Sequence, residues 1–174
     1  AGMHRNLGLI RQDRGNHVMA EQDLAQAVAI YRKHPGPTPR MYLARSLVPL
    51  GVSLLQVGDY PAARDAAQEA LEILEELNPG NQLRLGLALA LQGAALVQLG
   101  EYQAAVQPLL AGYDALVTAE LDGHDQTSAR DAKFKCMSDL IRAYEGLSMA
   151  EEAESWRGRL DVARQAISAQ ESVE

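Results

Sequence analysis

The segment LGVSLLQVGDYPAA (residues 50–63) decides the fold, because its skeleton returns elsewhere in the chain. It recurs 42 residues later as QG at 92–93 followed by GEYQAA at 100–105. It also occurs 43 residues earlier as LG at 7–8 followed by GNHVMA at 15–20, and a looser fourth copy covers 140–153. Internal repeats of this length are typical of solenoids built from stacked helical pairs.

A second apolar stripe follows the first three copies, with the i, i+3, i+4, i+7 spacing of one helix face. The stripes are Leu24/Ala27/Val28/Tyr31, Ala67/Ala70/Leu71/Leu74 and Leu109/Gly112/Tyr113/Leu116. Each unit is therefore predicted to hold a helix A, a tight turn and a helix B. Eight helices are expected near 3–15, 18–33, 40–57, 61–77, 82–99, 102–119, 127–146 and 149–170.

Two sets of glycines mark the units. The first set is expected to end helix A in the left-handed conformation that glycine tolerates: Gly15, Gly58 and Gly100. The second set lies inside helix A, where glycine costs about 1 kcal/mol, so we expect the backbone of helix B to approach closely: Gly8, Gly51 and Gly93. In the fourth unit, Ser148 and Glu151 have the spacing of a capping box.

Composition and charge limit the class of function. Hydrophobic residues make up 47% of the 174 residues and aromatic residues only 5%, which favours closely packed helices over strands. The formal net charge of −7 argues against a nucleic-acid or anionic-membrane partner. The most apolar stretch, Leu85–Leu99, is too short to span a bilayer. A single cysteine, Cys136, excludes an internal disulfide and favours a cytoplasmic location.

Catalytic and metal-binding motifs are missing from the sequence. It contains no glycine-rich phosphate loop, no G-x-S-x-G, no H-E-x-x-H and no C-x-x-C, so we expect no enzyme, no cofactor and no metal site. His124 is the one histidine beside carboxylates, and we interpret it as part of a solvated loop. Cys136 is interpreted as a buried structural thiol rather than a reactive one.

The repeated small residues, with leucine before glycine in two units, resemble the tetratricopeptide motif. That motif normally has 34 residues, and here the extra residues lie in linkers at 35–43, 78–85 and 120–133. The resemblance implies an all-α fold, a right-handed tetratricopeptide-repeat α-solenoid of about four helix-turn-helix units. As a single domain over 1–174, its repeats would cover about 1–34, 44–77, 86–119 and 134–170. Long repeats of this kind resemble those of kinesin light chains and many bacterial regulatory proteins.

The last third of the chain is similar to the C-terminal repeat regions of some bacterial serine/threonine protein kinases. The similarity rests on QPLLAGYDAL (107–116), LIRAYE (140–145) and EAESWR (152–157). Nothing in the chain resembles a kinase catalytic domain. We expect the chain to be a fragment of a larger one. A regulatory or self-association domain attached to a catalytic domain, such as a protein kinase, is therefore one alternative function.

The resemblance also implies where a partner binds, because helices A line the concave side of tetratricopeptide arrays. Aligning the units on Gly8, Gly51, Gly93 and Ile141 assigns a peptide-binding groove to Arg5, Leu9, Gln12, Arg45, Val48, Val52, Gln56, Ala90, Ala94, Gln98, Ser138 and Arg142. Chaperone-binding relatives clamp a terminal carboxylate with Lys and Asn on these faces. Here the two inner units offer Val48, Val52, Ala90 and Ala94 instead, so no carboxylate clamp is predicted. Alternatively, these apolar side chains simply pack between neighbouring A helices. The predicted function is binding of a peptide segment or partner protein, with a homodimer as a further option.

Overall fold

The computed structural model describes residues 1–122 and 126–171, and these ranges hold eight α-helices and no strand. The helices are α1 (Gly2–Asp13), α2 (His17–Arg32), α3 (Pro37–Val57), α4 (Tyr60–Leu77), α5 (Gln82–Gln98), α6 (Tyr102–Leu121), α7 (Gln126–Gly146) and α8 (Ala150–Glu171). All eight predicted helices are confirmed. The largest difference is at α3, which begins at Pro37 instead of residue 40 because two prolines fit the first turn of a helix.

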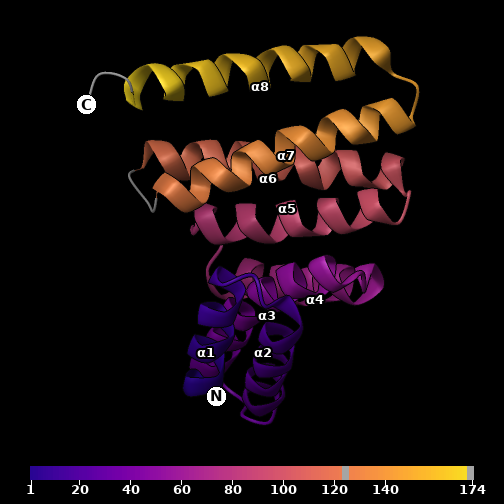
Figure 1. Ribbon diagram of the computed structural model, residues 1–174. Coiled ribbons are helices and arrows are strands. Elements are labelled where there is room, and N and C mark those ends of the chain that lie inside the picture. The colour runs from indigo at the N-terminus through magenta and orange to yellow at the C-terminus, as the bar shows by residue number, and fades with distance from the viewer. Residues whose placement is uncertain (123–125, 172–174) are drawn as a thin grey trace.

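The helices stack as four pairs in chain order (Figure 1). The axes of α5 to α8 lie nearly parallel across the view, with the chain direction alternating, whereas α1 and α2 stand steeply to them, so the stack turns along its length. Contacts show which side is concave: α1, α3, α5 and α7 touch one another in succession, but in the described residues α2, α4, α6 and α8 do not. The more closely spaced layer of helices A therefore forms the inner surface, as predicted for a helical-repeat solenoid.

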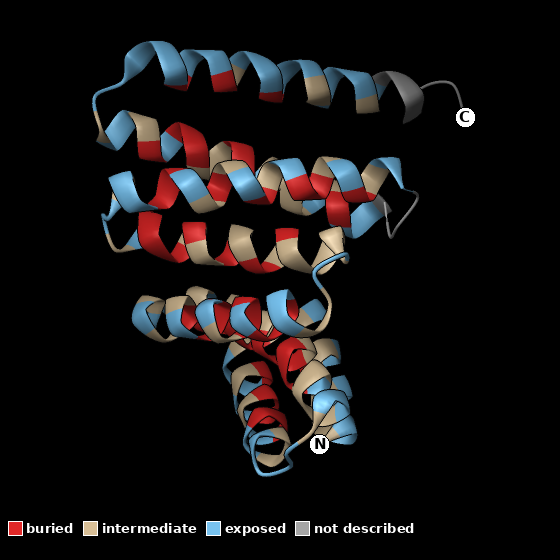
Figure 2. Ribbon diagram, turned by 180° about the vertical axis from the view of Figure 1, so that it is seen from behind, coloured by how far each residue is buried: buried red, intermediate tan, exposed pale blue. Residues whose placement is uncertain are grey.

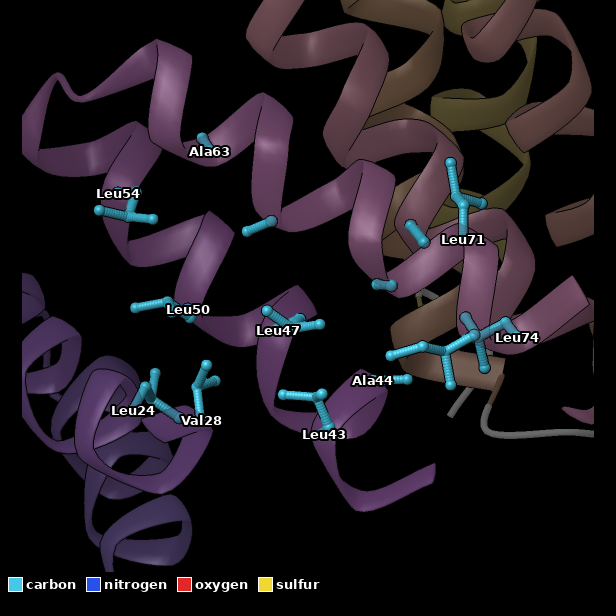
Figure 3. Close-up of a cluster of buried hydrophobic side chains, with 14 of the residues drawn as sticks. Leu24, Val28, Leu43, Ala44, Leu47, Leu50, Leu54, Ala63, Leu71 and Leu74 are labelled. Carbon is cyan, nitrogen blue, oxygen red and sulfur yellow. The ribbon is translucent and has the colours of Figure 1, made fainter. Parts of the chain in front are cut away.

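The apolar stripes of helices B and buried side chains of helices A together form the core, which lies between the two helix layers (Figure 2). Leu24, Leu74, Leu109 and Leu116 are at most 1% exposed. In the part of the core that includes Leu24 and Leu74, alanines such as Ala44 and Ala63 lie among the leucines, and their small side chains let neighbouring helices approach closely (Figure 3). The buried apolar residues form two clusters, one from α2 to α5 and one from α5 to α8, so each cluster draws on more than one helical pair.

The turns inside each unit follow one backbone pattern. Gly15, Gly58 and Gly100 have φ of 74°, 88° and 76°, so the predicted left-handed residues are confirmed. Ser148 occupies the same position in the fourth unit, with φ of 59°, two residues before α8 begins. The predicted capping box is therefore wrong: Ser148 ends the preceding turn, and Met149 immediately precedes the helix.

The glycines inside helices A have two kinds of neighbour. A Cβ on Gly8 would lie 2.6 Å from Leu24 Cγ, and one on Gly93 would overlap Leu109, so both glycines face helix B of their own unit. At Gly51 that expectation is wrong. A Cβ there would meet Leu91 of α5, which is helix A of the next unit. Gly51 therefore brings two units together instead of the two helices of one unit.

Helix α3 contains Pro49, which has no N–H and so leaves the carbonyl of Arg45 without its helical donor. Two side chains of α1 bind α3 here, one at the Arg45 carbonyl and one a turn further along the helix. Arg5 Nε donates a hydrogen bond to the Arg45 carbonyl at 3.3 Å. Gln12 Nε2 donates to the Pro49 carbonyl at 3.0 Å and to Ser53 Oγ at 3.1 Å. The first helix is thereby tied to the one place where the α3 ladder is interrupted.

Candidate functional site

The inner surface of the A helices contains two adjoining cavities. One, of about 630 Å³, lies between α3, α5 and α7. The other, of about 460 Å³, lies between α1, α3, α5 and the start of α7. Both are lined by Val48, Val52, Leu87 and Ser128, so they form one channel, called here the groove. We call the larger cavity its C-terminal half and the smaller one its N-terminal half.

The structure brings eleven of the twelve predicted site residues into this groove. The N-terminal half contains Arg5, Leu9, Gln12 and Arg45, the shared stretch contains Val48 and Val52, and the C-terminal half contains Gln56, Ala90, Ala94, Gln98 and Arg142. Ser138 is the exception. It lines a separate cavity with Phe134 and Arg164, and its hydroxyl donates to the Phe134 carbonyl at 3.0 Å.

The floor of the groove is apolar but not closed. Val48, Val52, Ala90 and Ala94 are all half-buried, so each packs against neighbouring helices while keeping part of its surface accessible. These residues can therefore pack between the helices and also form part of a binding surface. A partner segment could add to packing that the helices have only partly completed.

The two halves of the groove differ in charge. The N-terminal half has three arginines, Arg5, Arg45 and Arg84, and no acidic side chain among the described residues that line it. The C-terminal half has two basic residues, Lys135 and Arg142, against two acidic ones, Asp131 and Asp139. The groove as a whole is therefore basic on a chain whose formal net charge is −7.

Sequence reasoning missed Arg84 and both aspartates. Arg84 could have been found, because it lies three residues before Leu87 and continues the 84, 87, 91, 94, 98 stripe of α5 by one turn. Asp131 and Asp139 could not, since only the packing of α7 across α5 directs that face of α7 into the groove.

Burial dominates the electrostatics beneath the C-terminal half. It raises the pKa of the Asp139 carboxyl, and the nearby Arg142 and Lys135 partly oppose that rise. Arg142 Nη1 lies 3.6 Å from Asp139 Oδ1. Burial, and then the Asp139 charge, raise the pKa of the Cys136 thiol to about 12. Cys136 is 1% exposed and stays protonated near neutral pH, so its prediction as a buried thiol is confirmed.

The remaining sequence predictions concern chemistry and membranes. Among the described residues, no three His, Cys, Asp or Glu side chains gather as a metal site would require. His124 lies outside the described residues. None of the helices in the described part of the chain combines the length and the apolar character needed to cross a membrane.

Two models of known protein families match this chain, over two ranges of residues. Residues 42–116 match one family model described as tetratricopeptide repeat, and residues 5–38 match a second model with the same description. No curated protein matches the chain. The two matched ranges cover most of α1 to α6, and these helices supply every lining residue of the N-terminal half of the groove except Ser128.

Proposed function

We propose that this chain, a tetratricopeptide-repeat protein over residues 5–38 and 42–116, binds an extended segment of a partner protein in its groove. Tetratricopeptide repeats generally mediate protein–protein interaction and are typically non-catalytic scaffolds. The observation that carries the proposal is the continuous groove, with a half-buried apolar floor and charged walls. A cytoplasmic location remains a prediction.

The chemistry of the groove describes the segment. Valine, alanine and leucine side chains on the floor favour small aliphatic anchors, and the basic excess favours acidic or phosphorylated residues beside them. An extended segment loses conformational freedom when it docks, so we expect an affinity of about 1 μM.

Ala94→Arg tests this proposal. Ala94 is half-buried on the floor of the C-terminal half, where a long charged side chain would occupy the volume that the segment needs. We expect binding of a partner isolated by pull-down and then purified to weaken at least tenfold, about 1.4 kcal/mol. Calorimetric titration of the parent and the variant measures this.

The matched control is Ala111→Arg, which adds the same charge at an exposed position on α6, outside the groove. Circular dichroism must show that both variants keep the helical content of the parent. A partner that binds folded Ala94→Arg as tightly as the parent would place the binding surface elsewhere, on the helices B or the linkers.

A second candidate function, self-association, is favoured by an apolar stripe on α1. Met3, Leu7 and Ile10 are 80%, 39% and 48% exposed. Their 3, 7, 10 spacing puts them on the side of α1 opposite Arg5, Leu9 and Gln12. An exposed stripe of large apolar residues is typical of an interface, and a second copy would cover it by an isologous contact. Such a contact would also suit a regulatory domain attached to an enzyme.

Light scattering over a range of concentrations tests this candidate. We expect the parent mass to rise towards that of a dimer, and Ile10→Glu to remain monomeric because the contact would then bury an unpaired charge. Val162→Glu, at a 68% exposed position of α8 at the other end of the array, should behave like the parent. A parent that stays monomeric at every concentration would remove this candidate and leave groove binding untouched.

A further inference from the structure

Three arginines of the N-terminal half of the groove lack acidic partners. Arg5, Arg45 and Arg84 come from α1, α3 and α5, and none forms an ion pair with any described residue. Elsewhere in the described chain, arginines do pair with carboxylates: Arg11 with Asp23, Arg32 with Glu69, Arg40 with Glu76, and Arg157 with Glu145 and Glu154. Arg14, Arg159 and Arg164 also form no ion pair with a described residue, but all three are exposed, whereas the groove arginines are half-buried. We call Arg5, Arg45 and Arg84 the arginine triad.

The three charges are close enough to repel one another. Burial, and then the Arg45 charge, lower the pKa of Arg5. Burial, followed by the charges of Arg45 and Arg5, lowers the pKa of Arg84 in the same way. Like charges gathered in a partly buried place are unfavourable, and an anion bound between them would reverse that contribution.

Two of the three guanidinium groups, those of Arg45 and Arg5, are also held in place. The Arg45 guanidinium carbon lies 5.5 Å from the centre of the Tyr42 ring, which stacks on Tyr31 at a centroid distance of 5.7 Å. Arg45 Nε is buried and has no hydrogen-bond partner among the described residues. Arg5 has only its Nε engaged, on the Arg45 carbonyl. Oriented donors without acceptors are the arrangement expected at an anion site.

We propose that the arginine triad binds a phosphoryl group carried on a side chain of the partner segment. The partner segment in this inference is the one in the proposed function, so that part rests on the proposed function. Binding of an anion at the triad does not. A phosphoryl group offers nearly two negative charges and three acceptor oxygens, whereas a carboxylate offers one charge and two oxygens. Three guanidinium groups fit the larger charge better, since each can pair with two oxygens. The mixed charges of the C-terminal half would then receive the unphosphorylated end of the segment.

Inorganic phosphate is the first probe, because it tests the triad on the chain alone. Thermal unfolding is followed at increasing phosphate, with sodium chloride adjusted to constant ionic strength, and the rise in midpoint gives an apparent Kd. Phosphate also stabilises proteins by exclusion from their surface, so variants are needed to isolate binding. We expect Arg84→Gln and Arg45→Gln each to weaken the apparent Kd about tenfold, the usual effect of losing a hydrogen bond to a charged group.

Arg14→Gln is the matched control. It removes the same charge from an exposed residue just after α1 that does not line the groove, and we expect it to respond to phosphate like the parent. Arg5 is left intact, because it also holds the Arg45 carbonyl. Equal stabilisation of the parent, Arg84→Gln and Arg45→Gln would overturn the proposal. So would succinate, a dicarboxylate, if it protected the parent as well as phosphate does.

A second experiment uses the partner segment itself as the probe. Once the partner segment is mapped, its phosphorylated peptide should bind the parent at least tenfold more tightly than the unphosphorylated one, and Arg84→Gln should abolish that difference. A difference that persists in Arg84→Gln would count against the triad. If phosphate fails to bind the chain, the triad proposal falls and groove binding stands. If phosphate binds but Ala94→Arg leaves partner binding unchanged, the groove proposal falls and the anion site stands.

Discussion

Gly112→Leu is expected to destabilise the chain by about 3 kcal/mol, at the upper end of the usual range for overpacking. A Cβ on Gly112 would lie 3.0 Å from Ala90 N, 3.2 Å from Leu89 Cβ and 3.3 Å from Gly86 O, all on α5. Two of these atoms belong to the backbone, so the only relief is to move helix α5 away from α6. Urea unfolding followed by circular dichroism measures the change in the free energy of unfolding.

The control for this prediction is Ala111→Leu, one residue away on the exposed side of α6. A surface substitution of this kind should change the free energy of unfolding by no more than about 0.5 kcal/mol. At Gly51, by contrast, the three atoms nearest to an added Cβ all belong to the Leu91 side chain, which can change rotamer. If Gly112→Leu and Ala111→Leu were equally stable, the close approach of α5 and α6 would be wrong.

The second large effect is expected at Leu109, which is fully buried and fits against the space left by Gly93. Leu109→Ala should cost about 3 kcal/mol, because it removes apolar contacts and leaves a cavity. Gly93→Ala alone should also destabilise, since the new Cβ would overlap Leu109 Cγ and lie 2.6 Å from Cδ2. Both substitutions together should cost less than the sum of the two, because the Cβ at residue 93 partly fills the cavity at residue 109.

A double-mutant cycle measures this coupling. We expect an interaction free energy of about 1 kcal/mol in the stabilising direction, within the range seen for residues in contact. Leu140→Ala combined with Gly93→Ala serves as the comparison, because the three atoms nearest a Cβ on Gly93 all belong to Leu109, whereas Leu140 is equally buried. Strict additivity for Leu109 and Gly93 would show that the side chain does not occupy the space left by the glycine.

The repeat pattern predicted the fold because each unit is specified locally. Glycine at the turn and the stripe of each helix B recur at fixed positions, and each helix packs mainly on its neighbours in the chain. The contact of Gly51 with Leu91 could not be predicted in this way, since it depends on how far one unit turns relative to the next. Ser148 was misassigned because its role depends on a positive φ that serine rarely adopts.

The residues that line the groove could be predicted where their positions are fixed by the spacing from a repeat glycine. On α7 the prediction was less accurate. That helix has no glycine in the equivalent position, and its groove-lining face runs through Ser128, Ala132, Lys135, Asp139 and Arg142. Ser138 is one residue, or about 100°, away from that face. Placing the arginine triad required the structure, because three residues from three units become neighbours only when α1, α3 and α5 are stacked.

The hydrogen bonds from α1 to the interrupted ladder of α3 bear on how the array opens. In a linear array the end units fray first, because each is held by one neighbour only. Here, release of α1 would leave the Arg45 carbonyl without the donor that Pro49 cannot supply, and would free the Pro49 carbonyl and the Ser53 hydroxyl from Gln12. Detaching the first helix would therefore weaken the second pair as well. The first two pairs thereby become one cooperative unit. Opening at this end of the array therefore involves two helical pairs instead of one.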